Sequence, residues 1–130
     1  MDVGCGPFGA VDTLATLVNP SGQVIGLDKS ASVVRYAAAI LGTDTNGNIH
    51  WLVEDIHHTD IIRRQLENKS VGVAYCRFLL AHQTNPGETL AAIAALVRPG
   101  GYIVAHEWLD DPQYPKFEPE IPEVYRNIEI

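Results

Sequence analysis

The first nine residues of this chain, from Met1 to Gly9, place three glycines directly after an acidic residue, Asp2. Glycine allows a backbone to turn sharply and allows a ligand to approach the main chain closely. A helical pattern of apolar residues begins immediately afterwards, so this segment predicts a turn from a strand into a helix. At the top of a parallel sheet, such a turn is where α/β proteins hold nucleotide-like ligands.

Short apolar segments and helical patterns alternate along the rest of the chain. Apolar runs predict strands over residues 23–27, 49–53, 71–76 and 102–106. Apolar residues at helical spacing predict helices over residues 11–18, 30–41, 59–67 and 86–97. Short, continuously apolar strands between helices are typical of a parallel sheet covered on both faces. The predicted fold class is therefore α/β.

Composition narrows the classes of function. The 130 residues suffice for one domain, and their net charge of -7 argues against nucleic acid or an anionic membrane surface as a partner. The two cysteines, Cys5 and Cys76, have neither metal-site spacing nor a disulfide framework, so no metal is expected. We find no signal peptide and no apolar run of membrane-spanning length, and we therefore expect a cytoplasmic protein.

Acidic residues follow two of the predicted strands. Asp28 ends the second strand, where a carboxylate can accept hydrogen bonds from both hydroxyls of a ribose. Asp55 follows the third strand and could accept a hydrogen bond from an adenine amino group, with Glu54 and Asp60 as alternatives. The backbone N–H of Ile56 could reach a ring nitrogen of the same base.

Five motifs together resemble the class I S-adenosylmethionine-dependent methyltransferases, in their small-molecule branch. They are the acid-x-Gly-x-Gly signature at residues 2–6, the second strand with its ribose acid at 24–28, the adenine segment at 53–56, the fourth-strand segment at 74–82 and the Pro-Gly-Gly turn within 96–102. The resemblance covers residues 1–108. It implies a Rossmann-like three-layer sandwich with a mainly parallel sheet, of which about five of the usual seven strands are present.

The resemblance also implies a cofactor, a reaction and a set of site residues. The cofactor is S-adenosylmethionine, and the reaction is methyl transfer to a small-molecule acceptor. The implied cofactor-binding residues are Asp2, Gly4, Cys5, Gly6, Gly9, Asp28, Lys29, Asp55, Ile56, Cys76 and Arg77. No catalytic residue is assigned. His82 and His106 are weak candidates for a general base, which the reaction needs only if the acceptor must lose a proton.

Two departures from the family pattern keep other functions open. The third glycine, Gly9, comes one residue late, and the chain looks truncated at both ends. Residues 109–130 form a Pro-rich acidic tail that we interpret as the start of a substrate-cap region. The glycine spacing also fits an NAD(P)-dependent oxidoreductase, and the missing strands also fit a non-catalytic cofactor-binding fragment. An exposed edge of the fourth or fifth strand predicts a homodimer.

Overall fold

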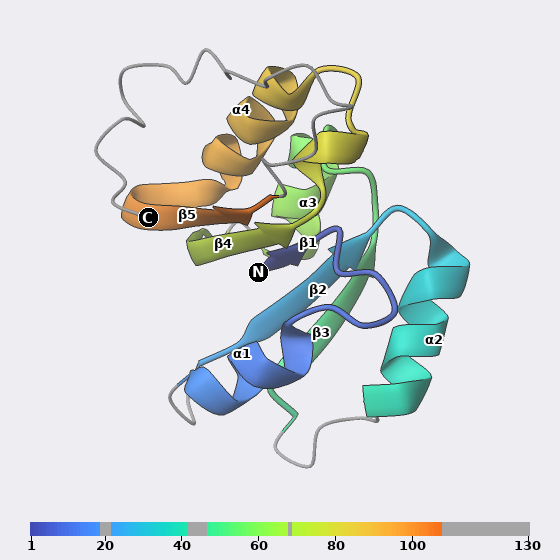
Figure 1. Ribbon diagram of the computed structural model, residues 1–130. Coiled ribbons are helices and arrows are strands. Elements are labelled where there is room, and N and C mark those ends of the chain that lie inside the picture. Colours follow the sequence, from blue (N-terminus) through green and yellow to red (C-terminus); the bar gives the residue numbers. More distant parts are fainter. Residues whose placement is uncertain (19–21, 42–46, 68, 108–130) are drawn as a thin grey trace.

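The computed structural model describes residues 1–18, 22–41, 47–67 and 69–107, which form strands and helices in alternation (Figure 1). The strands are β1 (Asp2–Val3), β2 (Val24–Asp28), β3 (Ile49–Val53), β4 (Val71–Arg77) and β5 (Val97–His106). The helices are α1 (Val11–Leu17), α2 (Ala31–Leu41), α3 (Thr59–Gln65), the 3-10 helix η1 (Leu80–His82) and α4 (Pro86–Leu96).

The five strands form one sheet in the order β3-β2-β1-β4-β5, and every neighbouring pair is parallel. Although β1 has two residues, it pairs on both sides, with Asp2 opposite both Gly26 and Tyr75. The strand order reverses between β1 and β4, and open α/β sheets bind ligands at such a switch point, outside the carboxyl ends of the strands. The predicted α/β fold with about five parallel strands is confirmed.

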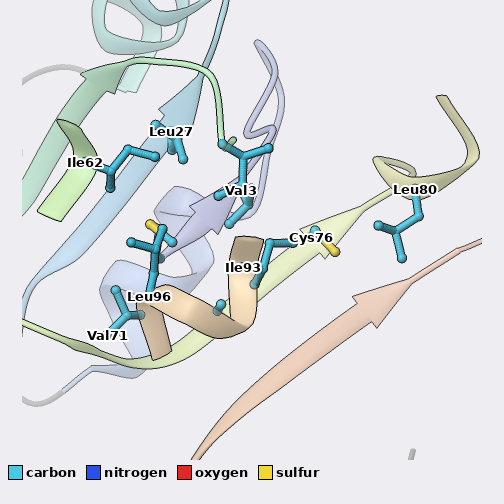
Figure 2. Packing of buried hydrophobic residues seen from close by; sticks show 11 residues of the cluster. Val3, Leu27, Ile62, Val71, Cys76, Leu80, Ile93 and Leu96 are labelled. Atoms are coloured by element: carbon cyan, nitrogen blue, oxygen red, sulfur yellow. The ribbon is translucent and has the colours of Figure 1, made fainter. Parts of the chain in front are cut away.

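Helices cover the two faces of the sheet as separate layers (Figure 1). On one face, Ile62 of α3 and Ile93 and Leu96 of α4 pack onto Val3 and Leu27 in the main core cluster (Figure 2). On the other face, a smaller cluster gathers Cys5, Val11 and Val24, with Trp51 and side chains of α1 against it, among others. The glycine turn follows β1 at the carboxyl ends of the strands, and its Cys5 side chain belongs to the smaller cluster.

Among the residues that the structure describes, one face of β4 and β5 is covered less than the rest of the sheet. On the face that carries α1 and α2, Val73 and Val104 are each 45% exposed and Tyr102 is 64% exposed. These side chains alternate with buried ones such as Ala74, which points to the main core. Apolar runs could not reveal this, because both faces of these strands carry apolar residues whether or not a helix covers them.

Local differences from the predicted elements are small. Strand β5 begins at Val97, earlier than expected, and its pairing shifts from Val71 opposite Val97 to Val73 opposite Tyr102. The Pro-Gly-Gly turn therefore forms a bulge within β5, and Gly100 has a positive φ of 74° there. Within the described residues, β5 is an edge strand and β4 is not, so only the fifth-strand edge remains for the predicted dimer.

Two further sequence predictions concern the C-terminal tail and the absence of a membrane-spanning segment. The acidic tail at 109–130 lies outside the described residues. No helix among the residues that the structure describes is long and apolar enough to cross a membrane.

Candidate functional site

The turn after β1 is held against β2 by its own backbone. The N–H groups of Gly4 and Cys5 both donate to the carbonyl oxygen of Leu27, at 2.8 and 3.0 Å. Gly4 and Gly6 have φ values of +67° and +57°, a conformation that glycine adopts without steric cost. The backbone therefore turns away from the strand direction at Gly4 and Gly6, while the side chain of Cys5 is buried in the smaller core.

Asp2 fixes the end of this turn that leads into α1. Its carboxylate accepts a 2.7 Å hydrogen bond from the backbone N–H of Ala10, just before α1. The side chain is 2% exposed, and this burial raises the pKa of Asp2. Gly9 crosses directly over it: a Cβ at Gly9 would collide with the carbonyl oxygen of Cys5 and lie 2.6 Å from the Asp2 carboxylate. Glycine is thus required at Gly9 by close approach.

Asp28 joins the glycine turn to the start of α2. One carboxylate oxygen accepts from the N–H of Gly6 at 3.1 Å, and the other accepts from the N–H of Ser30 at 2.9 Å. These two bonds fix the rotamer of Asp28 at the end of β2. Each oxygen keeps a further lone pair for a ligand hydroxyl. Lys29, the next residue, is exposed.

The end of β3 carries two carboxylates, each paired with its own histidine. Asp55 Oδ1 lies 2.8 Å from Nδ1 of His57, and Glu54 Oε1 lies 2.8 Å from Nδ1 of His58. Hydrogen bonding lowers the pKa of both carboxyls. The largest cause is the backbone N–H of His57 for Asp55 and the ring of His58 for Glu54. The side chain of Ile56 is buried in the main core, so only its backbone is available to a ligand.

The end of β4 faces the glycine turn through Arg77. Its guanidinium donates a 2.7 Å hydrogen bond to the carbonyl oxygen of Phe8 and lies 5.9 Å from the ring centre of Phe78. Phe78 has a positive φ of 54°, which is uncommon for a bulky residue and often marks a functional site. The Phe78 ring lies 5.3 Å from that of His106, while Cys76 is fully buried in the core.

A hollow of about 180 Å³ lies between the glycine turn and the end of β4. Its lining combines predicted and unpredicted residues: Asp2, Gly4, Cys5, Gly6, Pro7, Phe8, Gly9, Ala10, Arg77 and Phe78. Asp28 adjoins the hollow through its bond to Gly6, whereas Asp55 and both histidine candidates lie outside its lining. His106 approaches it through Phe78; His82, at the end of η1, is exposed.

A larger hollow, of about 930 Å³, lies at the amino ends of the strands and includes Met1, Val24 and Val71 in its lining. None of the predicted site residues lines it. The smaller hollow is the candidate site, because ligands of open parallel sheets bind at the carboxyl ends of the strands.

Both thiols are poor nucleophiles. Burial raises the pKa of Cys5 to about 12, with Asp2 and Asp28 adding to the effect, and burial likewise raises the pKa of Cys76 to about 12. Neither Cys5 nor Cys76 is therefore a candidate nucleophile. Among the described residues, no group of three metal-ligating side chains comes together.

Phe8, His57 and Thr89 are site features that the predicted cofactor-binding residues did not include, and Phe78 lay within the fourth-strand segment at 74–82 without an assigned role. The strained φ of Phe78 and its packing against His106 arise from tertiary structure, without a signal in the sequence. His57 carried a weak signal, as a histidine two positions after Asp55, whereas its other partner, Thr89, lies on α4 and is fully buried.

A parallel sheet in the order β3-β2-β1-β4-β5, with a glycine turn after β1 and acids after β2 and β3, is the architecture of a class I methyltransferase. The methyltransferase domain family matches residues 1–124, and the chain belongs to this family. The sequence resemblance to the S-adenosylmethionine-dependent methyltransferases is thereby confirmed.

Two curated relatives match most of this chain. An uncharacterized 37.1 kDa protein in transposon TN4556 of Streptomyces fradiae is 36% identical over 107 residues, 82% of this chain and 29% of that protein. A ubiquinone biosynthesis O-methyltransferase of Hydrogenovibrio crunogenus is 29% identical over 104 residues, 79% of this chain and 39% of that enzyme. The chain thus spans well under half the length of these relatives.

Solved structures support the same fold. A methyltransferase in complex with the Trm112 methyltransferase activator of Haloferax volcanii has a TM-score of 0.58 and 26% identity, over 78% of this chain and 41% of that one. The plantazolicin methyltransferase BpumL, in complex with a pentazolic substrate analogue and S-adenosylhomocysteine (SAH), has a TM-score of 0.52 and 19% identity. That match covers 75% of this chain and 34% of BpumL and shows the fold alone.

Proposed function

We propose that this chain binds S-adenosylmethionine at the carboxyl ends of β1, β2 and β3 and transfers its methyl group to a small-molecule acceptor. The observation that carries the proposal is the Asp28 carboxylate. It is fixed at the end of β2 by the N–H groups of Gly6 and Ser30 and retains outward lone pairs for the two hydroxyls of a ribose.

The residues around the hollow suit this cofactor in shape and charge. A Cβ at Gly6 would meet only the Gly4 carbonyl oxygen, at 4.0 Å, so the backbone is open to a ligand there. Pockets for whole small ligands typically measure about 300–1,000 Å³, so a hollow of about 180 Å³ would take only part of the cofactor. Asp2 and Asp28 beside it favour a cationic ligand over a phosphorylated one.

We assign the subsites in order along the sheet. Gly4, Gly6 and Gly9 would admit the methionine portion, and Asp2 would attract its amino group, directly or through water. Asp28 would bind the ribose, and Asp55 would accept from the adenine amino group. When bound, S-adenosylmethionine supplies a methyl group already activated on a sulfonium, so the chain mainly has to align donor and acceptor. Such alignment can contribute about 7–11 kcal/mol in favourable cases.

The acceptor side of the hollow is aromatic. Phe8 and Phe78 line it and are 69% and 40% exposed, and His106 packs against Phe78. These rings support a small, planar acceptor, in keeping with the O-methyltransferase relative that serves ubiquinone biosynthesis. Of the two general-base candidates, His106 is the better placed, because its neighbour Phe78 borders the hollow, whereas His82 does not touch the lining.

Isothermal titration of the purified chain with SAH tests the proposal. Wild type should bind SAH, and Asp28→Ala should weaken binding by about 100-fold, because two hydrogen bonds to a charged acceptor are lost. Asp12→Ala removes an exposed carboxylate on α1 and is the matched control; its affinity should equal that of wild type. Equal SAH affinity in Asp28→Ala and Asp12→Ala would remove the ribose assignment.

The same titration with NADH separates the alternative of an NAD(P)-dependent oxidoreductase. The glycine spacing fits both ligands, but a buried Asp2 beneath the turn would repel a pyrophosphate. Binding of NADH without SAH, or of neither ligand, would overturn the proposal, whereas binding of SAH without methyl transfer is the result expected for the non-catalytic cofactor-binding fragment. A homodimer through the β5 edge and a cytoplasmic location stay predictions.

A further inference from the structure

The carboxylate of Asp55 is held on one side only. Its Oδ1 accepts from the backbone N–H of His57 at 3.0 Å and faces the ring Nδ1 of the same histidine at 2.8 Å. Among the described residues, no hydrogen bond to Oδ2 is recorded. One histidine thus occupies one carboxylate oxygen twice and leaves the other for a ligand.

The His57 ring is itself anchored at its opposite nitrogen. Nε2 lies 3.2 Å from the hydroxyl oxygen of Thr89, which sits in the first turns of α4 and is completely buried. Nδ1 faces a carboxylate, so it carries the proton in the neutral ring, and Nε2 can then accept from the Thr89 hydroxyl, which also lies 3.4 Å from the carbonyl oxygen of Asn85. The contacts at both nitrogens hold the orientation of the ring, which spans from the end of β3 to α4.

We propose that His57 is a positioning residue for the adenine subsite: anchored by Thr89, it orients the Asp55 carboxylate so that Oδ2 accepts from the exocyclic amino group of the base. The inference rests on the proposed function, since it assigns Asp55 that partner. His57 does not touch the cofactor. It acts by holding a 39%-exposed carboxylate in one rotamer before the ligand arrives.

The neighbouring pair provides an internal comparison. His58 contacts Glu54 at the same 2.8 Å, but its side chain is 59% exposed and nothing in the described part of the chain holds its Nε2. A histidine–carboxylate contact alone is therefore common to both pairs, and the buried anchor on α4 is particular to His57. Loss of His57 should matter to ligand binding, and loss of His58 should not.

Calorimetric titration with SAH and with S-inosylhomocysteine, in which an oxo group replaces the exocyclic amino group, tests this. In wild type, SAH should bind more tightly than the inosine analogue. His57→Phe should weaken SAH binding by roughly threefold to tenfold and leave the analogue unchanged, because only SAH uses the oriented Asp55 oxygen. His57→Asn keeps a donor near the Nδ1 position and should recover part of the preference, whereas His58→Ala should behave as wild type.

The affinities of the variants for the two ligands decide whether His57 positions Asp55. If His57→Phe weakens both ligands equally, the residue is merely structural and the inference fails; if it weakens neither, the inference also fails. Thr89→Val removes the anchoring hydroxyl at nearly constant volume and should give a smaller loss of the same selective kind. If wild type discriminates between the ligands but no variant changes this, the proposed function stands and the inference is wrong. If wild type does not bind SAH, both are wrong.

Discussion

The two ends of the candidate cofactor site are built by different means. At the β1 end, backbone groups fix the glycine turn, and the one carboxylate beneath it, Asp2, is buried. At the β3 end, side chains on the surface fix one another, as Asp55 and His57 do. The pKa values of the two carboxyls shift in opposite directions: burial raises the pKa of Asp2, whereas hydrogen bonds lower the pKa of Asp55.

The two ends should therefore differ in how well they tolerate substitution. A turn made by backbone geometry has few alternative conformations, so a substitution within it should cost both stability and ligand binding. A site made by exposed side-chain contacts should keep its fold when one contact is lost, and only the ligand should register the loss. Substitutions at the two ends test whether they differ in this way.

Gly9→Ala should have the largest effect. The added methyl would collide with the Cys5 carbonyl and approach the Asp2 carboxylate, and both are fixed by the surrounding structure. We expect a loss of about 3 kcal/mol in the free energy of unfolding and loss of SAH binding. Urea denaturation followed by circular dichroism measures the first, and calorimetry measures the second.

Gly87→Ala, on α4, is the matched control for this substitution. A Cβ there would meet only the Asn85 side chain, at an ordinary 3.6 Å, so the fold should be unchanged or slightly stabilised. If Gly9→Ala were as stable as Gly87→Ala, the turn would be able to rearrange, and the contrast between the two ends would disappear.

Asp2→Asn should have the next largest effect, and its two consequences have opposite signs. Asparagine can still accept from the Ala10 N–H, but it removes a buried charge and the attraction for the cofactor's amino group. We expect SAH affinity to fall about tenfold. The free energy of unfolding at neutral pH should rise, because burial of the charged carboxylate opposes folding.

The pH dependence of unfolding checks the sign. Because burial raises the Asp2 pKa above 3.8, the folded chain holds this proton to higher pH than the unfolded chain does. Stability contributed by the protonated form is therefore lost as pH rises from about 3.8 through the folded pKa. Asp2→Asn should lack this decline. An identical pH profile in wild type and Asp2→Asn would mean that Asp2 is not buried in solution.

The same contrast explains what the sequence could reveal. The glycine spacing around Gly4 and the acid at Asp28 were predictable, because positive φ and close approach demand glycine and strand ends gather at one edge. The link from His57 to Thr89 was not predictable, since it depends on how α4 packs against the end of β3. Nor could the apolar runs show that Tyr102, within the described part of the chain, is largely exposed.

Glu54→Gln should have the smallest effect and tests whether the surface contacts of the β3 end form in solution. Hydrogen bonding to Glu54 raises the pKa of His58 above 6.5. The pair's contribution to folding stability is therefore complete below pH 6.5 and is lost as pH rises through the folded pKa. In Glu54→Gln, the pKa of His58, measured by NMR titration, should fall toward its ordinary value.

Asp60→Asn is the control: it removes a more exposed carboxylate of α3 and should leave the pKa of His58 unchanged. Because neither Glu54 nor His58 is assigned to the cofactor, SAH affinity should stay as in wild type. An unshifted His58 would show that the 2.8 Å contact is not populated, and it would place greater weight on the buried Thr89 anchor as the reason why His57 alone is held.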